Sequence, residues 1–407
     1  MIMRSITPLQ WRTLFAAQMG WILDGMDVML YAFALTSIQK EFGLTSAVAG
    51  SMASLTLVTS SFGGILAGWL ADRYGRARVL MFSILIYSAF TGATATSQTI
   101  WQLAVWRSLV GFGLGAEWSA GSVLVAETWA PKYRGRAIAF MQSGWAIGYI
   151  FAALLAGYIL PRYGWRTLFL CGTAPALFAL WVRGNIQEPE IWSALKQAQK
   201  GLQPAILPEL LKQPNRRNIL IASSLCACVL FAYWGLFTWM PAYLASPVSK
   251  GGAGLGIVKT TAWIIPLQIG AFLGYISFGF LADRFGRRNT FAAFTLSAAL
   301  LIPVFGSGRL SPTALLAISP LIGFFGHGYF SVFGSLLAEL FPSAIRATAQ
   351  GLCYNAGRLV SAFSPWVIGA VADQQGIGPA LAVTSLFFLA GTLVVFLLPE
   401  SKGAQLA

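Results

Sequence analysis

Charged residues are scarce in this sequence. Only 10% of its 407 residues are Asp, Glu, Lys or Arg, whereas 57% are hydrophobic. A soluble domain carries about 25% charged residues, because it must cover its surface with groups that water solvates. Much of the surface of this protein must therefore face a medium other than water. The composition argues against a soluble enzyme, a disordered chain and a disulfide-rich scaffold.

Histidine and cysteine are also rare. There is one histidine, and the four cysteines (Cys171, Cys226, Cys228 and Cys353) lie in or beside apolar stretches without the spacing of a zinc motif. We interpret the cysteines as small packing residues. We expect no metal and no cofactor. Because no ATP-binding motif is present either, we expect no enzymatic activity and hence no catalytic residue.

The net charge of +14 raises the question of nucleic-acid binding. Such binding needs basic residues gathered on one solvated face or arm. Here the Lys and Arg residues lie in short loops between long apolar runs. We therefore expect no nucleic-acid partner.

Long apolar runs are what the sequence has instead. A helix needs about 20 mainly apolar residues to cross a bilayer. Twelve segments qualify: 13–38, 47–71, 79–97, 100–128, 137–160, 165–183, 218–245, 257–282, 289–306, 312–340, 347–372 and 379–399. The sequence therefore predicts an all-α integral membrane protein with twelve transmembrane helices. It comprises an N-terminal six-helix bundle (1–183), a polar cytoplasmic linker (184–217) and a C-terminal six-helix bundle (218–407).

The distribution of Lys and Arg predicts the orientation. With the N-terminus inside the cell, inside segments hold 19 of the 27 basic residues and outside loops hold six, while Arg107 and Arg358 fall within spans. Cytoplasmic loops of membrane proteins carry such an excess of positive charge. We expect a multi-pass protein of the inner (plasma) membrane with both termini in the cytoplasm.

The chain also repeats itself at an offset of about 211 residues. The segment from Gly68 to Arg76 (GWLADRYGR) returns from Gly279 to Arg287 (GFLADRFGR). Each copy lies in the loop between the second and third predicted spans of its half. Two six-helix halves related by an axis along the membrane normal, with a central site between them, are typical of an alternating-access transporter.

These motifs carry a family resemblance. The pattern G-x-L-A-D-R-x-G-R in both halves, together with Arg107-xxx-Gly111-x-Gly113-x-Gly115, resembles the signature of the major facilitator superfamily. Gly68 and Gly279 are expected to allow close helix approach. The resemblance implies charged gating residues on the cytoplasmic side: Asp72, Arg73, Arg76, Glu127, Arg134, Asp283, Arg284, Arg287, Glu339 and Arg346.

Two carboxylates lie in the first span. Asp24 and Asp27 are three residues apart, so they share one face of a helix. Two carboxylates at membrane depth cannot both ionise cheaply, and we expect one of them to carry a proton. The alternative is a hydrogen bond that packs the first span against a neighbour.

The fourth predicted span contains two further ionisable residues, Arg107 and Glu117. Resemblance to proton-coupled sugar members of the superfamily implies that Arg107 pairs with an aspartate of the first span, and Asp27 is favoured slightly over Asp24. We interpret Glu117 either as a proton or substrate group or as a clamp between helices. The predicted proton-coupling set is therefore Asp24, Asp27, Arg107 and Glu117.

Arg358 is the candidate for binding substrate. An arginine in a central cavity attracts an anion, and its guanidinium holds a carboxylate with two hydrogen bonds. The alternative is that Arg358 lies near the cytoplasmic end and extends to the interface. Aromatic residues that face the cavity would stack on the substrate: Trp118, Trp145, Tyr149, Tyr233, Trp234, Trp239, Tyr329 and Tyr354 lie on spans. The predicted substrate-binding set is Arg358, Trp118, Tyr329, Tyr354, Tyr233 and Asn355.

The single histidine, His327, lies on the tenth predicted span between Gly326 and Gly328. It either relays protons or has a hydrogen-bonded packing role.

The segments Asp24-Gly25-Met26-Asp27 and Gly115-Ala116-Glu117-Trp118 resemble the sialic acid and carboxylate proton symporters, near the aromatic acid symporters. This resemblance implies import of an organic anion (sialic acid-like, monocarboxylate or aromatic carboxylate) by proton symport through alternating access. We expect a monomer in the lipid bilayer. The alternative function is efflux of drugs or metabolites by proton antiport, which predicts a wider apolar cavity and no need for Arg358.

Overall fold

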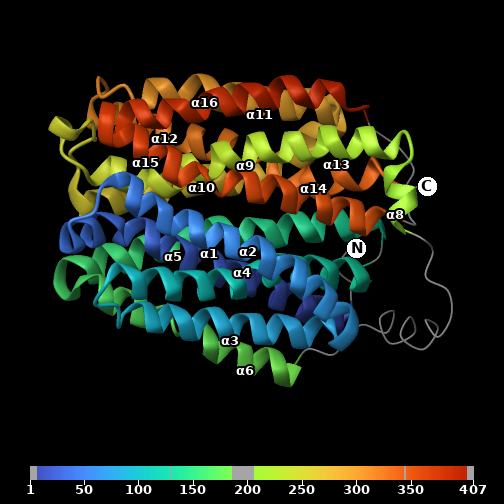
Figure 1. The fold of residues 1–407 in the computed structure, drawn as a ribbon. Helices are drawn as coiled ribbons and strands as arrows, with labels where there is room; N and C mark the ends of the chain where they lie inside the picture. Colours follow the sequence, from blue (N-terminus) through green and yellow to red (C-terminus); the bar gives the residue numbers. More distant parts are fainter. Residues whose placement is uncertain (1–6, 130, 186–205, 343–344, 401–407) are drawn as a thin grey trace.

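The fold is known from a computed structural model that describes residues 7–129, 131–185, 206–342 and 345–400 (Figure 1). Every regular element in these ranges is a helix. The N-terminal half comprises α1 (Pro8–Phe42), α2 (Ser46–Tyr74), α3 (Arg76–Thr94), α4 (Ile100–Thr128), α5 (Pro131–Cys171) and α6 (Pro175–Asn185). The short α8 (Ile206–Leu211) lies in the predicted linker, most of which is outside the described residues.

The C-terminal half comprises α9 (Asn215–Ala245), α10 (Gly256–Phe285), α11 (Arg287–Phe305), α12 (Pro312–His327), α13 (Phe330–Glu339), α14 (Arg346–Ser361), α15 (Ser364–Gln375) and α16 (Ile377–Val394). Two short 3-10 turns, Val248–Lys250 and Val395–Leu397, follow α9 and α16. The order of elements matches the predicted all-helical membrane fold.

Eight described helices are long and apolar enough to cross a membrane. One of these segments, Arg136–Ala179, contains two predicted spans, and the chain turns between them at Gly164, whose φ of 75° suits glycine. The three other predicted spans correspond to α4, to α12 with α13, and to α14 with α15. The protein is therefore a multi-pass membrane protein.

Two predicted spans are each divided into two helices, which the sequence did not indicate. The span 312–340 is divided between α12, which ends at His327, and α13, which begins at Phe330. The span 347–372 is divided between α14 and α15. Pro365 explains the second break, because it has no N–H to donate to the carbonyl of Ser361.

Glycines on α4 bring the N-terminal helices into close contact. A Cβ at Gly113 would lie 2.7 Å from the backbone nitrogen of Tyr87 on α3, and one at Gly115 would collide with the Ser60 carbonyl on α2. The Arg107-to-Gly115 motif thus provides a surface on which α2 and α3 pack directly. The expectation for Gly279 was wrong, since a Cβ there would meet no atom of the described residues within 4 Å.

The two halves lie side by side, with α1–α6 below and α9–α16 above in Figure 1. Helices α1, α2 and α5 of the first half pack against α9, α15 and α10 of the second. We call the end of the molecule that holds the connections 43–45, 95–99 and 246–255 the loop end, and the opposite end, where both termini lie, the termini end.

Hydrogen bonds close the loop end between the halves. The carboxylate of Asp373, near the end of α15, accepts bonds from the backbone N–H groups of Ser46 (2.8 Å) and Ala47 (2.9 Å) at the start of α2. Thr261 on α10 donates to the Ala153 carbonyl on α5 (3.0 Å). The structure is therefore closed at the loop end.

Candidate functional site

A small cavity lies between the two halves. Its lining includes Asp24 of α1, Arg107 of α4 and Trp145 of α5 from the first half, and Trp234 of α9 and Arg358 of α14 from the second. The space open to the centre of a water molecule is about 30 Å³, enough for one or two waters. An organic acid is larger, so the cavity must widen to bind one.

The charged residues Asp24 and Arg358 belong to opposite halves and both line this cavity. Only 2% of Asp24 and 8% of Arg358 is exposed. The two side chains interact electrostatically. Among the described residues, neither Oδ1 of Asp24 nor Nε of Arg358 has a hydrogen-bond partner. The cavity therefore brings a carboxylate of one half close to a guanidinium of the other, and both groups have capacity for further hydrogen bonds.

A second pair, Asp27 and Arg107, lies within the N-terminal half. Both residues are fully buried and interact electrostatically. They do not form a direct ion pair: in the described part of the chain both oxygens of Asp27 and two guanidinium nitrogens of Arg107 lack hydrogen-bond partners. The Arg107 guanidinium instead lies 5.1 Å from the centre of the Tyr31 ring, a cation–π contact. The structure thus places Asp27 beside Arg107 and Asp24 beside Arg358.

Glu117 lies at the contact between α4 and α1. A Cβ at Gly20 would collide with its Oε1 atom. Only 2% of Glu117 is exposed, and neither carboxylate oxygen has a hydrogen-bond partner among the described residues. Glu117 is not part of the lining of the cavity. Both interpretations of this residue stay predictions.

Four of the other predicted substrate residues, Tyr329, Tyr354, Tyr233 and Asn355, lie outside the cavity lining. Tyr329 donates its hydroxyl to the Val229 carbonyl (3.3 Å), and Asn355 donates to the Gly351 carbonyl (2.9 Å). Tyr354 packs against Phe333, and Tyr233 packs against Trp234. The side chain of Trp118 lies outside the described residues.

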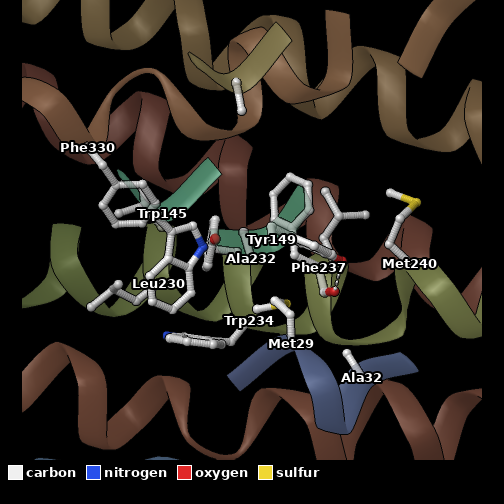
Figure 2. Close-up of a cluster of buried hydrophobic side chains, with 14 of the residues drawn as sticks. Met29, Ala32, Trp145, Tyr149, Leu230, Ala232, Trp234, Phe237, Met240 and Phe330 are labelled. Carbon is white, nitrogen blue, oxygen red and sulfur yellow. Dashed lines mark hydrogen bonds between the residues drawn. The ribbon is translucent and has the colours of Figure 1, made fainter. Parts of the chain in front are cut away.

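Trp145 and Trp234 form an aromatic wall of the cavity, one from each half. Figure 2 shows the two indoles, whose ring centres are 5.9 Å apart at 87°. The ring centre of Trp21 lies 5.0 Å from that of Trp145. Both indoles were among the aromatic residues considered from the sequence. The small hydroxyl residues of the lining, Thr56 and Ser60, were missed. Their only signal is a polar residue inside an apolar span.

Most of the predicted gating side chains cannot be placed. Those of Asp72, Arg73, Arg76, Glu127, Arg134, Asp283, Glu339 and Arg346 lie outside the described residues. Arg284 is described and lies over the ring of Phe285. The backbone N–H groups of Arg287 and Arg288 donate to Glu400 (3.0 and 3.2 Å), which caps the start of α11. The gating roles stay predictions.

The structure contains neither a cluster of three potential metal ligands nor a disulfide in the ranges that it describes. The four cysteines are free, and Cys226 and Cys353 are buried. The described interior is therefore held together without metal ions or disulfides.

Comparison with known families gives two matches. Residues 19–267 match the family described as "Major Facilitator Superfamily", and residues 187–407 match "Sugar (and other) transporter". The computed structure also resembles the inward-open xylose transporter XylE from E. coli, with a TM-score of 0.77, 18% sequence identity and 98% of each chain covered. The latter similarity shows the fold.

Three curated relatives extend along almost the whole chain. A "Putative metabolite transport protein" of Haemophilus influenzae is 35% identical, covering 97% of this chain and 98% of the relative. A "Cis,cis-muconate transport protein" of Acinetobacter baylyi is 34% identical, covering 96% and 95%. The "Sialic acid transporter NanX" of Escherichia coli is 28% identical, covering 95% and 93%.

Proposed function

Because this chain belongs to the Major Facilitator Superfamily, we propose that it is a secondary transporter that imports a small organic anion together with protons. The resemblance to this family that the motifs indicated is confirmed. The similarity to transporters of sialic acid and other carboxylates is confirmed as well. The family and these relatives are transporters and not enzymes. Anion import and proton coupling are the steps that the proposal adds.

The observation that carries this proposal is the meeting of Asp24 and Arg358 in the cavity. Arg358 can hold a substrate carboxylate with two hydrogen bonds. While Asp24 is ionised, it competes with that carboxylate for the positive charge of Arg358. A proton on Asp24 removes the competition, so protonation and anion binding favour each other. This coupling supports symport, and it predicts that uptake rises as the external pH falls.

Asp27 and Arg107 form a second pair whose charge affects the cavity. Arg107 also lines the cavity, so it adds positive potential there when Asp27 is protonated. An inside-negative membrane potential opposes the entry of an anion, and cotransported protons offset the negative charge that is carried inward. We propose that Asp24 and Asp27, with Arg107 and Glu117, form the proton-coupling set.

The closed loop end supports a direction for the cycle. If the termini are cytoplasmic, as the basic residues predict, the loop end faces the outside of the inner membrane. Anion entry then requires α2 to separate from α15 and α5 from α10, and release requires the termini end to open. The charged motifs near the termini end would act as the inner gate, and one chain suffices for this cycle.

The substrate class follows from Arg358 and from the aromatic wall. Two relatives are named for cis,cis-muconate and for sialic acid, both of them carboxylates. Trp145 and Trp234 offer flat surfaces to an unsaturated or aromatic acid. A drug exporter would not need Arg358 in its cavity, and the buried charges favour the anion over that alternative.

Purified protein in proteoliposomes tests the proposal. Benzoate, cis,cis-muconate and sialic acid are offered under an inward proton gradient, with and without a protonophore. We expect at least one acid to accumulate, faster at lower external pH, and the protonophore to abolish accumulation. Arg358→Gln should remove uptake, whereas Arg162→Gln, which removes an exposed cation at the loop end, should not. Dye extrusion without acid uptake would overturn the proposal.

A further inference from the structure

Several buried polar groups in the C-terminal half lack partners. In the described part of the protein, both ring nitrogens of His327, the hydroxyl of Tyr233 and both amide atoms of Gln268 make no hydrogen bond. His327 and Gln268 have no exposed surface, and 3% of Tyr233 is exposed. An unsatisfied buried polar group costs about 1–3 kcal/mol. Three such residues in one half call for a reason other than stability.

These residues lie next to the aromatic wall of the cavity. The Tyr233 ring is 5.4 Å from Trp234 and 5.1 Å from His327, in edge contacts with both. The hydroxyl of Tyr233 also lies near Nε1 of Trp145, although no hydrogen bond of good geometry joins them. Tyr233 thus connects the wall to His327.

Gln268 faces the same region from α10. It lies seven residues after Thr261 and seven before Tyr275, so the three share one face of the helix. Thr261 bonds to α5 of the other half, and the Tyr275 ring is 6.1 Å from His327. This face of α10 is therefore turned toward the junction of the halves, where the cavity lies.

His327 occupies the end of a broken helix. Helix α12 ends at this residue, and α13 begins at Phe330. The centre of its ring lies 4.0 Å from that of Phe237, and such apolar surroundings favour the neutral imidazole, which has one donor and one acceptor. Both ring nitrogens lack a hydrogen-bond partner among the described residues, so the ring can bond to another group. Transporters place such helix breaks where they bind substrate.

We propose that His327, Tyr233 and Gln268 form an uncharged subsite for a second polar group of the transported acid. This inference rests on the proposed function, in which Arg358 holds the carboxylate. The ligand class is a flat acid that carries a hydroxyl, a carbonyl or a ring nitrogen at the end away from its carboxylate. A second carboxylate fits poorly, because none of the three residues carries a charge to pair with it.

The aromatic wall explains how the subsite becomes accessible. Trp145 and Trp234 belong to opposite halves, so movement of one half against the other separates the two indoles. The separation uncovers Tyr233 and then His327 behind it. The substrate ring takes the place of the indole contact, and its polar group satisfies atoms that otherwise have no partner.

Matched pairs of acids test this subsite. Benzoate is compared with 4-hydroxybenzoate and with nicotinate as competitors of proton-driven uptake in proteoliposomes. The wild type should bind the two polar acids more tightly than benzoate. His327→Phe, Tyr233→Phe and Gln268→Leu each remove hydrogen-bonding atoms and should lower this preference about tenfold, while the affinity for benzoate stays within about twofold. His327→Gln keeps a donor and an acceptor and should restore part of the preference.

Tyr243→Phe is the matched control. Tyr243 lies on the same helix as Tyr233 and donates its hydroxyl to the Phe305 carbonyl (2.7 Å). Its loss should change the affinity for all three acids equally. An unchanged preference in the three subsite variants would overturn the inference, as would an equal loss for benzoate, which indicates packing alone. If sialic acid is transported but no aromatic acid binds, the inference fails and the proposed function stands; if no acid is transported, both fail.

Discussion

The two halves of this protein share a repeated motif but hold their buried polar groups differently. In the N-terminal half, Asp24, Asp27, Arg107 and Glu117 lie on the long helices α1 and α4. In the described C-terminal half the corresponding interior contains Arg358 and neutral polar groups, and the helices that carry Arg358 and His327 are interrupted. The N-terminal half thus holds most of the buried charged groups, whereas the described C-terminal half buries one arginine, neutral polar groups and aromatic rings.

This difference indicates a division of labour. Continuous helices hold acids at fixed depth, where proton binding changes their charge without a change of fold. Interrupted helices can change shape around a ligand. We infer that the N-terminal half binds the protons and that the C-terminal half recognises the anion, with the pair of Asp24 and Arg358 as the connection.

The largest effect is expected from substitutions in the pair of Asp24 and Arg358, which connects the two halves. Arg358→Gln should lower acid uptake at least about thirtyfold, because it removes the positive partner of both Asp24 and the substrate. Asp24→Asn imitates the protonated aspartate. It should lose proton-driven accumulation yet retain exchange of labelled for unlabelled acid across the membrane. Proteoliposome uptake and counterflow measure the two activities.

Two outcomes would contradict this assignment of roles. If Asp24→Asn still accumulates acid against its gradient, Asp24 does not carry the coupling proton. If Arg358→Gln loses only accumulation and retains counterflow, the division between the halves is wrong.

Asp27 and Arg107 test whether the charges of the N-terminal half act as a set. Asp27→Asn removes the negative charge that interacts with the buried Arg107 and should lower the free energy of unfolding by about 1–3 kcal/mol. Adding Arg107→Gln should recover part of this loss. Unfolding of the single and double variants in detergent measures the coupling, and strictly additive effects would show that the two residues are independent.

Gly20 and Gly279 offer a matched pair of substitutions, one in each half. Gly20→Ala pushes a methyl group into the carboxylate of Glu117 and should destabilise the protein by about 1–3 kcal/mol. Gly279→Ala meets no atom within 4 Å and should be close to neutral or slightly stabilising, since alanine favours the helix. Thermal unfolding of the two variants gives the difference, and equal effects would contradict the packing seen at Gly20.

The smallest expected effect concerns the closed loop end. Asp373→Asn weakens the cap that joins α15 to α2 and should cost the closed state about 0.5–2 kcal/mol. A cysteine introduced by Thr238→Cys in the cavity, in a chain without its natural cysteines, should then react several-fold faster with an impermeant thiol reagent added from outside.

Glu41→Gln is the control for this experiment. Glu41 bonds to Arg166 (2.6 Å) and to Trp165 (2.6 Å) at the same end of the molecule, but within the N-terminal half alone. Its loss should leave the reaction rate unchanged. Equal acceleration by both variants would indicate general loosening of the loop end instead of separation of the halves.

Much of the site could be predicted from the sequence because it consists of charged residues in otherwise apolar spans. Asp24, Asp27, Arg107, Glu117 and Arg358 stand out as charges in apolar spans, and the structure buries all five. Hydrogen-bonding residues such as Gln268 and Thr238 do not stand out, since a single polar residue is common in a spanning helix. The breaks after His327 and Ser361 were missed because the apolar pattern continues across them.

The sequence by itself determined the class of protein, the order and approximate bounds of the spans, and the family. These follow from local properties: the length of apolar runs, the position of basic residues and a motif that occurs twice. Only the tertiary structure decided that Asp24 and Arg358 line the same cavity, that Asp27 interacts with Arg107 and that Tyr233 packs against the aromatic wall. The physical reason is that rotation of a helix about its axis depends on its neighbours, and a helix that is apolar on every side carries little information about which face turns inward.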